Sequence, residues 1–305
     1  MLPPKVAIII VNWNSFYHTN NCINSLKKIN YKDFDIIVVD NGSEDNSGKA
    51  LKETHPEIIL LQSPVNTGFA GGNDIALKYS IEKKYTYSLL LNNDTFVEPD
   101  FLDELPAYMD EHENVGACQP KIFYHSQPHI LWNGGSVYNR FLGITYSRRY
   151  LRKEGKWQKS IHEVDWITGC AFFVRNSILQ ETGLLSNNMF MYYEDVEFSM
   201  RIKRKGYQLM FFPGSVVYHI AGASLKEKKR GKEGYLNPRV HYFNFRNNIW
   251  FLKKYTPLYF APTVVLFNLF YYGAFLCYFL IRGRFKKFKA VLMAIKDGLI
   301  YKITY

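Results

Sequence analysis

The 305 residues are 47% hydrophobic and 17% aromatic, which predicts a well-packed globular protein and excludes a disordered one. The net charge of +11 is uneven, because residues 226–305 carry 16 Lys and Arg against 3 Asp and Glu, whereas residues 1–225 carry 22 against 24. Since the main part of the chain lacks a basic excess, we expect no nucleic-acid partner.

Neither the cysteines nor the N-terminus indicates export. The cysteines at 22, 118, 170 and 277 are far apart and form no C-x-x-C pair. This spacing predicts neither a disulfide framework nor a zinc site and favours a reducing cytosolic setting. The opening MLPPKVAIIIVNWN has a short apolar run and no cleavage site of small residues, so we interpret it as a first strand rather than a signal peptide.

The first hundred residues alternate strand-like and helix-like segments. Apolar stretches at residues 5–11, 35–40, 58–62 and 87–91 predict strands, and the segments 17–28, 47–54 and 70–83 predict helices. Strands that are apolar throughout and separated by helices indicate a parallel sheet covered on both faces. We therefore expect a doubly wound α/β fold.

The pattern loosens from about residue 115. Residues 121–165 are rich in aromatic, glycine and basic residues without a clean period, which predicts loops and short strands. Regularity returns in GCAFFV at 169–174 and in a helix that begins near Glu194. That helix has acids at its start, basic residues at 201 and 203–205 and Gly206 beyond its end, as the helix dipole and a glycine C-cap favour.

Residues 255–281 contain no charged residue and are long enough to cross a bilayer. Four residues interrupt this apolar stretch, namely Pro257, Pro262, Asn268 and Gly273. Basic residues flank both ends, at 253–254 and 282–287, so a single span would carry one basic flank across the membrane, against the positive-inside tendency. The stretch is too short for two spans of roughly 20 residues each.

The end of the tail has the pattern of a basic amphipathic helix. Apolar residues line one face and lysines the other, namely Phe285, Phe288, Leu292, Ile295 and Leu299 against Lys286, Lys287, Lys289 and Lys296. Such a helix fits an anionic membrane surface. Our hypothesis is a tail embedded in one leaflet with both ends cytoplasmic. A single transmembrane helix and a hydrophobic hairpin buried in a homo-oligomer are the alternatives.

Polar residues follow each of the four predicted strands. These clusters are Asn12-Trp13-Asn14, Asp40-Asn41-Gly42-Ser43, the run NTGFAGGN from Asn66 to Asn73, and Asn92-Asn93-Asp94. Each alone is ordinary turn chemistry. Carboxyl ends of parallel strands meet at one edge of a sheet, however, and open α/β sheets bind their ligands there. Four such clusters together predict a polar ligand site.

The residues at this edge narrow the choice of ligand. A dinucleotide site wants G-x-G-x-x-G after the first strand, where this chain has NWNSFY, and no G-x-x-x-x-G-K-[ST] loop occurs. Asp40 is well placed to accept hydrogen bonds from a ribose or a base. Asp94 is a hard oxygen ligand suited to Mg²⁺ or Mn²⁺ holding a diphosphate.

Seven motifs, in order, resemble those of the family 2 glycosyltransferases, which have the GT-A fold. They are IIIVNWN, VVDNGS, NTGFAGGN, LLLNNDT, TGCAFFVR, MYYEDVEFSMRIKRKG and VYHIAGAS, and they run through most of the first 250 residues. The set looks most like the bacterial rhamnosyltransferase-type branch that acts in cell-surface polysaccharide assembly. We accordingly expect a GT-A domain at 1–225, with a nucleotide-sugar half at 1–114 and an acceptor half at 115–225. A basic connector at 226–254 and a membrane-associated tail at 255–305 would follow.

The resemblance also implies roles at the site. Asp40 contacts the nucleotide base, and Asn92-Asn93-Asp94 takes the place of the family's DxD motif, with Asn92 at its first aspartate and Asp94 as the sole carboxylate. His219 is offered as a further metal or diphosphate ligand, although a histidine after an apolar strand is more often structural. The donor-binding residues expected at this edge are Asn12, Asp40, Asn41, Ser43, Asn66, Gly71, Asn73, Asn92 and Asn93.

Glycosyl transfer needs a stabilised diphosphate and a base for the acceptor hydroxyl. Acids such as Glu194 and Asp195 are ordinary at a helix start, but the resemblance places the base at this pair, and we assign it to Asp195. A base on the opposite face of the sugar implies direct displacement with inversion. The expected acceptor-side residues are Trp166, Thr168, Gly169 and Glu194, and a core position explains Trp166 equally well.

The sequence thus predicts an inverting, metal-assisted glycosyltransferase, peripheral or monotopic at the cytoplasmic face of the cell membrane. Its expected partners are a nucleotide-diphosphate sugar, a lipid-linked glycan and anionic lipids. RNNIW at 246–250 is similar to the QxxRW motif of processive synthases but lacks the glutamine and has the wrong spacing, which favours transfer of a single residue. A catalytically silent nucleotide-sugar-binding membrane module is the alternative. A sugar nucleotidyltransferase is disfavoured because NWNSFY is not a glycine-rich basic loop.

Overall fold

The computed structural model describes residues 5–222, 226–231 and 233–301. The first four residues of the N-terminal segment, the last two of VYHIAGAS and the last four of the tail lie outside the described residues. The chain forms two compact units. Unit 1 comprises Met1–Val137, Ser147–Asn187 and Glu194–Ala221, and unit 2 comprises Tyr138–Tyr146, Asn188–Tyr193 and Gly222–Tyr305.

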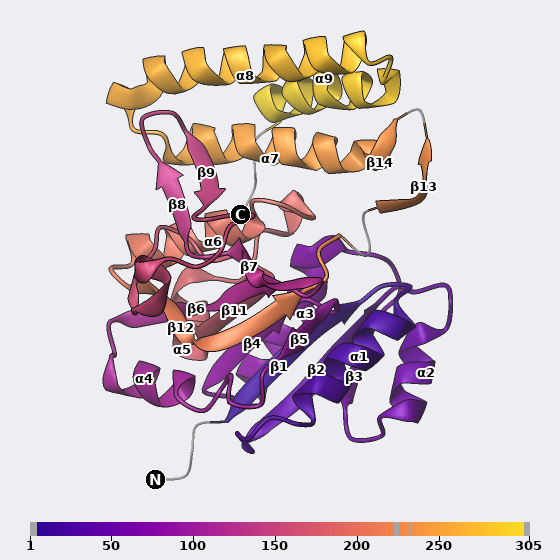
Figure 1. The fold of residues 1–305 in the computed structure, drawn as a ribbon, viewed down its shortest axis with the longest axis vertical. Helices are drawn as coiled ribbons and strands as arrows, with labels where there is room; N and C mark the ends of the chain where they lie inside the picture. Colours follow the sequence, from indigo (N-terminus) through magenta and orange to yellow (C-terminus); the bar gives the residue numbers. More distant parts are fainter. Residues whose placement is uncertain (1–4, 223–225, 232, 302–305) are drawn as a thin grey trace. The chain divides into compact units, whose positions relative to one another are not determined.

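Unit 1 is built on a ten-stranded sheet (Figure 1). Within the described residues its strands follow the order β10-β12-β6-β11-β4-β1-β2-β3, with β5 on β12 and β7 on β6. The strands are β1 (Val6–Asn12), β2 (Phe34–Asn41), β3 (Ile59–Ser63), β4 (Tyr87–Leu91), β5 (Thr95–Val97), β6 (Val115–Tyr124), β7 (Gln127–Asn133), β10 (His162–Glu163), β11 (Ala171–Arg175) and β12 (Gln208–His219).

The first four strands form the parallel half of this sheet. Strand β1 pairs in parallel with β2 and β4, and β2 pairs in parallel with β3. Asn12 lies opposite Asp40 in the β1–β2 register, so the polar ends of these two strands are side by side. The predicted α/β fold is therefore confirmed. Strand β11 then pairs antiparallel with β4 and extends the sheet toward β6 and β12.

Helices cover both faces of the sheet because successive strand residues point to opposite sides. Ile8 and Ile10 pack with residues of α1 (Phe16–Leu26), α2 (Ser47–Thr54) and α4 (Leu105–Glu111). Ile9 packs on the other side with α3 (Gly68–Glu82), α5 (Asn176–Thr182) and α6 (Glu194–Arg204). The region 121–165, where short strands and loops were expected, holds the end of β6, then β7, β8 (Ser136–Asn139), β9 (Ile144–Ser147), the 3₁₀ turn η1 (Lys156–Lys159) and β10.

Unit 2 is mainly helical. Its elements are η2 (Asn187–Met189) at its edge, β13 (Lys226–Gly231), β14 (Gly234–Leu236), α7 (Pro238–Tyr255), η3 (Leu258–Phe260), α8 (Ala261–Ile281) and α9 (Phe285–Ile300). Residues 226–254, expected as a connector, thus form a hairpin and most of a helix. That helix has its own buried face, and Phe245 and Ile249 of α7 pack with Phe279 of α8 and Val291 of α9.

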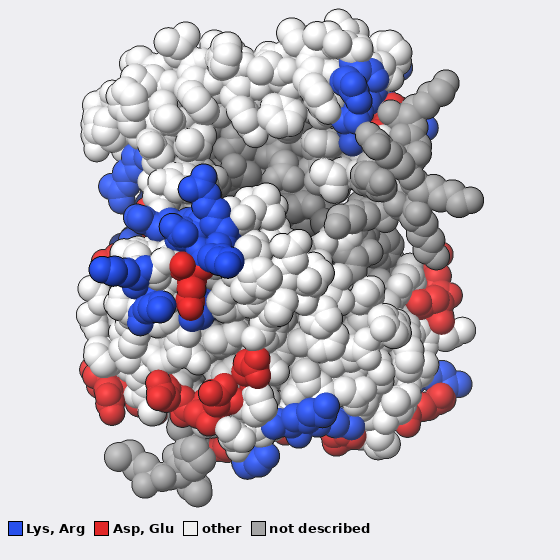
Figure 2. All heavy atoms as spheres, viewed as in Figure 1, with Lys and Arg blue, Asp and Glu red and all other residues white. Residues whose placement is uncertain are grey.

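Helix α8 is continuous, so the predicted interruptions of the apolar stretch are wrong for Pro262, Asn268 and Gly273. Pro262 lies in the first turn, where a proline removes no helical hydrogen bond. The Asn268 amide is satisfied by the carbonyls of Val264 and Leu142 at 2.8 and 3.2 Å. Residues Leu258–Ile281 are long and apolar enough to cross a membrane. Figure 2 shows a surface free of charge along most of α8.

Helix α9 forms where the amphipathic pattern predicts it, but it buries one lysine of the expected polar face. Its buried residues are Lys287, Val291, Ala294 and Gly298. Gly298 allows a close approach to α7, because a Cβ there would lie 2.9 Å from the Cβ of Ile249. On the apolar face expected at a membrane surface, Phe285 and Leu299 are 57% and 61% exposed, whereas Phe288 and Ile295 pack partly against the cluster of the tail helices.

Candidate active site

The ends of β1 and β2 are joined by one buried amide. The Nδ2 of Asn12 donates to Asp40 Oδ1 at 3.3 Å, to Ser43 Oγ at 3.3 Å and to Ser47 Oγ at 2.8 Å. Asn12 is fully buried and Asp40 is 8% exposed. The arrangement fixes the direction of the Asp40 carboxylate at the carboxyl edge of the sheet. Ser47, the first residue of α2, is a member of this cluster that the sequence motifs did not identify.

Asp40 rests against the first turn of α2. A Cβ at Gly48 would lie only 2.1 Å from Asp40 Oδ2, so a side chain at position 48 and the observed Asp40 rotamer exclude each other. Because Gly48 has no side chain, the Asp40 carboxylate can occupy its observed position.

Thr19 links the first strand end to the fourth. Its Oγ1 donates to Asn12 Oδ1 at 2.8 Å and accepts from Asn93 Nδ2 at 3.0 Å. Asn93 is thereby linked to Asn12 through Thr19. Thr19 was not predicted, because a threonine in the middle of helix α1 carries no signal of its own.

The NTGFAGGN run is held by Asn41. Its Nδ2 donates to Asn66 Oδ1 at 3.2 Å and to the Gly68 carbonyl at 2.9 Å, and its Oδ1 accepts from the Thr67 backbone at 3.0 Å. Asn73 does not join this group, because its buried amide donates to the Phe69 carbonyl of the same helix at 2.8 Å. Gly71 packs against Thr67, since a Cβ there would lie 2.6 Å from the threonine Cβ.

The fourth strand end brings Asp94 to His219. Asp94 Oδ1 lies 3.0 Å from His219 Nε2, and Asn92 Nδ2 lies 3.4 Å from the same nitrogen. The imidazole is buried, its Nδ1 has no hydrogen-bond partner among the described residues, and its ring is perpendicular to the Trp132 indole, with 4.5 Å between the ring centres. Trp132, from the aromatic-rich segment 121–165, thus borders this pair.

The Asp94–His219 pair offers few ligands for a metal ion. Among the described residues, no group of three or more His, Cys, Asp and Glu is arranged to hold one. One carboxylate oxygen and one imidazole nitrogen nevertheless suit Mn²⁺ or Mg²⁺ when phosphate oxygens and water complete the coordination shell. The donor set therefore fits a metal held jointly by protein and diphosphate.

Glu194 and Asp195 begin helix α6. Asp195 Oδ2 accepts from the Gly169 N–H at 2.8 Å, and its Oδ1 accepts from the Val196 N–H at 2.8 Å. Burial raises the pKa of the Asp195 carboxyl, and these two N–H groups oppose the rise. Burial and the neighbouring Asp195 charge raise the pKa of Glu194 well above its ordinary value. Glu194 Oε2 is buried without a hydrogen-bond partner among the described residues.

Residues 169 and 170 connect this pair to the fourth strand end. The Gly169 N–H donates to Asp195, and the Cys170 carbonyl accepts from the Asn92 N–H at 2.9 Å. Two adjacent residues therefore contact the acidic pair on one side and the Asn92-Asn93-Asp94 motif on the other. Sequence spacing gives no hint of this junction, because the residues come from three distant segments.

The structure places the expected acceptor residues Trp166 and Thr168 at buried positions of unit 1. Trp166 is 9% exposed, and its Nε1 donates to the Val137 carbonyl at 3.1 Å. Thr168 is also buried, and its N–H donates to Gln119 Oε1 at 3.4 Å. Gln119 in turn bonds to Asn133, also buried, at 3.0 Å. The buried hydrogen bonds of Thr168, Gln119 and Asn133 thus hold the residue that directly precedes the Gly169–Cys170 junction.

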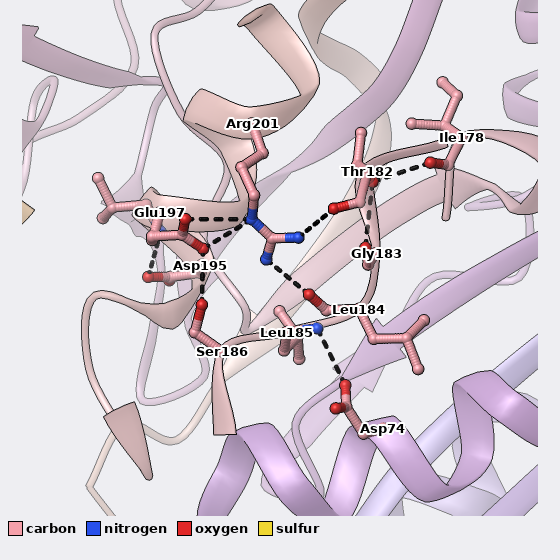
Figure 3. A network of polar contacts seen from close by, with 11 residues as sticks. Asp74, Ile178, Thr182, Gly183, Leu184, Leu185, Ser186, Asp195, Glu197 and Arg201 are labelled. Atoms are coloured by element: carbon pink, nitrogen blue, oxygen red, sulfur yellow. Dashed lines mark hydrogen bonds and ion pairs between the residues drawn. The ribbon is translucent and has the colours of Figure 1, made fainter. Parts of the chain in front are cut away.

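Helix α6 is anchored by a second buried network (Figure 3). Arg201 Nε donates to both oxygens of Glu197, and its Nη1 and Nη2 donate to the carbonyls of Thr182 and Leu184, each at 2.6 Å. The loop after α5 continues to the Leu185 N–H, which donates to Asp74 Oδ1 of helix α3 at 3.0 Å. The network thus joins α6 to α3, the helix that begins within the NTGFAGGN run.

Comparison with known proteins identifies the family of the chain. The profile described as Glycosyl transferase family 2 matches residues 7–183, more than half of the chain. The chain belongs to glycosyl transferase family 2. The predicted family is therefore confirmed, and the matched range includes Asp40, Asp94 and Gly169.

Several characterised proteins are similar to this glycosyltransferase. It is 25% identical to the low-salt glycan biosynthesis hexosyltransferase Agl10 of Haloferax volcanii over 66% of this chain and 62% of that protein, so it spans less than two thirds of that relative's length. It is 23% identical to the dTDP-rhamnosyl transferase RfbF of Shigella flexneri over 87% and 86%. The same identity relates it to an N-acetylglucosaminyl-diphospho-decaprenol L-rhamnosyltransferase of Mycobacterium tuberculosis over 70% and 75%. The predicted rhamnosyltransferase-like character is confirmed by these likenesses.

Among solved structures, the mannosyltransferase PcManGT from Pyrobaculum calidifontis, in complex with GDP-Man and Mn²⁺, has a similar fold. The TM-score is 0.57 at 15% identity, over 97% of this chain and 88% of that one. At this identity the likeness concerns the fold alone.

Proposed function

We propose that this family 2 glycosyltransferase is an inverting, metal-assisted enzyme. It transfers a sugar, with rhamnose as the first candidate, from a nucleoside-diphosphate donor to a hydroxyl of a lipid-linked glycan in cell-surface polysaccharide assembly. The observation that carries this proposal is the Gly169–Cys170 junction, which contacts Asp195 on one side and the Asn92-Asn93-Asp94 motif on the other. A base and a diphosphate site side by side are what sugar transfer requires.

The donor would occupy the carboxyl edge of the parallel strands. Asp40, oriented by Asn12, would accept hydrogen bonds from the base or ribose. Asp94 and His219 would hold Mn²⁺ or Mg²⁺ together with the diphosphate, and the metal would stabilise the negative charge that develops on the leaving group. The Mn²⁺ and GDP-Man named with the Pyrobaculum mannosyltransferase support this assignment.

Asp195 would act as the base. The acceptor oxygen attacks the anomeric carbon, the bond from that carbon to the diphosphate oxygen breaks, and the hydroxyl proton passes to the Asp195 carboxylate. A carboxylate whose pKa is raised by burial is a stronger base than an exposed one, and the Gly169 N–H holds it in a fixed direction. Attack opposite the leaving group inverts the anomeric centre.

Glu194 would contribute as an acid rather than as a second base. Because two neighbouring carboxylates resist carrying charge together, and the pKa of Glu194 is raised well above its ordinary value, we expect it to keep its proton near neutral pH. Its unpartnered Oε2 is then available to bond with an acceptor hydroxyl.

The relatives support the choice of donor and acceptor. RfbF is named for dTDP-rhamnosyl transfer, and the Mycobacterium protein for L-rhamnosyl transfer to a diphospho-decaprenol sugar. A lipid-linked acceptor also suits the exposed apolar surface of α8, where Leu266, Leu269 and Phe270 are 72%, 66% and 76% exposed. Such a surface would keep the enzyme at the membrane that contains its acceptor.

Release of nucleoside diphosphate from membrane-bound protein tests the proposal. dTDP-rhamnose and UDP- and GDP-sugars are each supplied with a mixed polyprenyl-linked glycan extract, with and without Mn²⁺. We expect release from one donor, lost on chelation and reduced about 10²–10⁴-fold in Asp195→Asn. The exposed carboxylate of Glu82, replaced in Glu82→Gln, is the matched control and should leave release unchanged.

Two results would contradict the proposal. Release in Asp195→Asn equal to that of the unchanged protein would remove Asp195 as the base. Donor binding without release from any sugar would instead favour the catalytically silent nucleotide-sugar-binding module.

A further inference from the structure

We propose that Asn247 of helix α7 is a positioning residue for the acidic pair Glu194–Asp195. It holds the preceding segment Asn188–Tyr193, here called the strap, whose last residue is bonded directly to Glu194. The inference rests on the proposed function in one respect, the catalytic role of Asp195. The strap and α7 belong to the same unit.

The strap has a backbone that its own residues do not favour. Phe190, Tyr192 and Tyr193 have φ angles of 62°, 68° and 67°, in the left-handed region that side chains with a Cβ rarely adopt. Three such residues within four positions persist only where the surroundings fix them, and they are concentrated at functional sites. Here they stand immediately before the proposed base.

Asn247 binds three carbonyl groups of this backbone. Its side chain is fully buried, and its Nδ2 lies 2.8 Å from the Met189 carbonyl, 2.9 Å from the Met191 carbonyl and 2.8 Å from the Tyr192 carbonyl. One amide group therefore forms hydrogen bonds with three carbonyl oxygens from four consecutive residues. No other residue type supplies a neutral, planar NH₂ group on so short a stem.

Arg246 and Asn248, the neighbours of Asn247, also bind the strap, and these three residues are here called the clamp. Arg246 Nε donates to Asn247 Oδ1 at 2.9 Å, and Arg246 Nη2 donates to the Asn188 carbonyl at 2.8 Å. The guanidinium also lies 4.2 Å from the ring centre of Trp250. The orientation of the Asn247 amide is thus determined, because its oxygen is occupied by a cation and its nitrogen must face the strap.

Asn248 extends the clamp to the apolar tail. Its Nδ2 donates to the Tyr193 hydroxyl at 2.9 Å, and its Oδ1 accepts from the hydroxyl of Tyr272 on helix α8. The motif RNNIW, which resembles a synthase motif only loosely, therefore has a structural purpose of its own. Its first three residues tie the strap to the helices of the tail.

The direction of Glu194 depends on the strap because Glu194 follows Tyr193 directly in the chain. The three captured carbonyls set the directions of the peptide planes up to Tyr193, and the next residue is the first of α6. Without the amide, the strap loses three of the hydrogen bonds that hold this backbone. The strap would relax toward ordinary backbone geometry, and the acidic pair would lose its set direction.

The test compares Asn247→Asp with Asn244→Asp in the full-length membrane-bound protein. The first change keeps the shape of the side chain but removes the donors and places a carboxylate against three carbonyls. The second is the matched control, because Asn244 lies on the same helix and, within the described part of the chain, its amide donates to the Val240 carbonyl of that helix at 3.0 Å and not to the strap. Asn247→Ser, which keeps one donor, is the milder variant should Asn247→Asp fold poorly.

We expect Asn247→Asp to lower kcat about 10²-fold, as a misplacement of about 1 Å does, while the affinity for dTDP, UDP or GDP stays unchanged. Asn247→Ser should lie between, and Asn244→Asp should match the unchanged protein. A kcat loss in Asn244→Asp as large as in Asn247→Asp, or a loss of nucleotide affinity in step with kcat, would overturn the proposal.

Hydrogen exchange separates this inference from the proposed function. In Asn247→Asp the amides of residues 188–196 should exchange faster, with those of strands β1 and β4 unchanged. If the unchanged protein transfers no sugar, the proposed function fails, and the exchange result still decides whether Asn247 holds the strap. Unchanged exchange at 188–196 would overturn the clamp whatever the activity.

Discussion

Arg201 and Glu197 form a buried ion pair one turn apart on helix α6, with Arg201 Nε 3.1 and 2.9 Å from the two carboxylate oxygens. Glu197 is fully buried and also accepts from Ser186 Oγ at 2.9 Å. The remaining guanidinium nitrogens bind two carbonyls of the loop after α5. Because the two charges balance each other and the guanidinium also binds the loop, this pair ties α6 to the loop and contributes to the stability of unit 1.

Removing the cation alone should destabilise the fold strongly. Arg201→Met would leave the Glu197 carboxylate buried without its partner, and we expect a loss of about 3–5 kcal/mol in the free energy of unfolding. Replacing both residues by methionine should lose less than the single change. Lys203→Met on the same helix breaks a partly exposed pair with Glu163 at 2.7 Å, a longer one with Asp165 and a hydrogen bond to the Val164 carbonyl at 3.2 Å, and should cost only about 1 kcal/mol. Urea denaturation followed by circular dichroism gives these values, and equal losses for Arg201→Met and Lys203→Met would contradict the argument.

Asp74, which binds the Leu185 N–H of the same loop, should make stability depend on pH. Burial raises its pKa from 3.8 to about 6. A carboxyl whose folded pKa exceeds its unfolded pKa binds its proton more tightly when folded, so the fold loses stability as pH rises from about 4 to about 6. Above that window the penalty is complete and amounts to about 3 kcal/mol, from 1.36 kcal/mol per pKa unit.

Asp74→Asn removes the titration but keeps an oxygen for the Leu185 N–H. The variant should be more stable than the unchanged protein at pH 8 by up to about 3 kcal/mol, and the difference should shrink toward zero or reverse by pH 4. Thermal unfolding across this range measures it. The control is Asp103→Asn, which alters an exposed carboxylate bonded to Asn30. A stability difference that is the same at pH 4 and pH 8 would show that Asp74 is not the titrating group.

Gly48 should control donor binding through Asp40. The Cβ of Gly48→Ala would lie 2.1 Å from Asp40 Oδ2, so the carboxylate must rotate and abandon its contact with Asn12. We expect at least about a tenfold weaker affinity for the nucleoside diphosphate, which is about 1.4 kcal/mol. Titration calorimetry with dTDP, UDP and GDP provides the measurement. Lys49→Ala, one residue on and exposed, is the control, and unchanged affinity in Gly48→Ala would remove Asp40 from the donor site.

The parallel half of the sheet could be predicted because its signal is local. Apolar runs ending in Asn and Asp mark both the strands and their edge, and β4 and α2 have the predicted bounds. Thr19 and Gly48 could not be found this way, because each matters only through a contact with a residue far along the chain. The Asn247 clamp is likewise invisible in sequence, since it joins a helix to a segment more than fifty residues earlier.

The tail shows the opposite failure, in which a local pattern misleads. Pro262 and Gly273 are helix breakers by propensity, yet an apolar helix has Pro262 in its first turn and continues through Gly273. In α9 the small residues Ala294 and Gly298 lie on the packed face with Val291, where a small side chain lets the helices approach closely. Hydrophobic periodicity could not tell which apolar residues of the helix pack on its neighbours and which stay exposed.

The exposed apolar residues of α8 predict contact with a membrane. Helices α7 and α9 pack along α8 through Phe245, Phe279 and Val291, and α7 carries Lys253 and Lys254 at its end. A span by α8 would draw these charged neighbours into the bilayer, which is costly. We therefore expect α8 to lie in one leaflet, with both of its ends on the same side.

Cysteine labelling in closed, inside-out membrane vesicles distinguishes the two arrangements. Leu258→Cys and Arg282→Cys, each in a Cys277→Ser background, mark the two ends of the apolar stretch, and Cys277 is the exposed cysteine among the four. A membrane-impermeant maleimide should label both positions from outside, whereas a spanning helix would leave one protected until detergent is added. Leu269→Asp with Phe270→Asp should release the protein from vesicles containing phosphatidylglycerol. Val65→Asp, an equally exposed apolar position in unit 1, should leave binding intact.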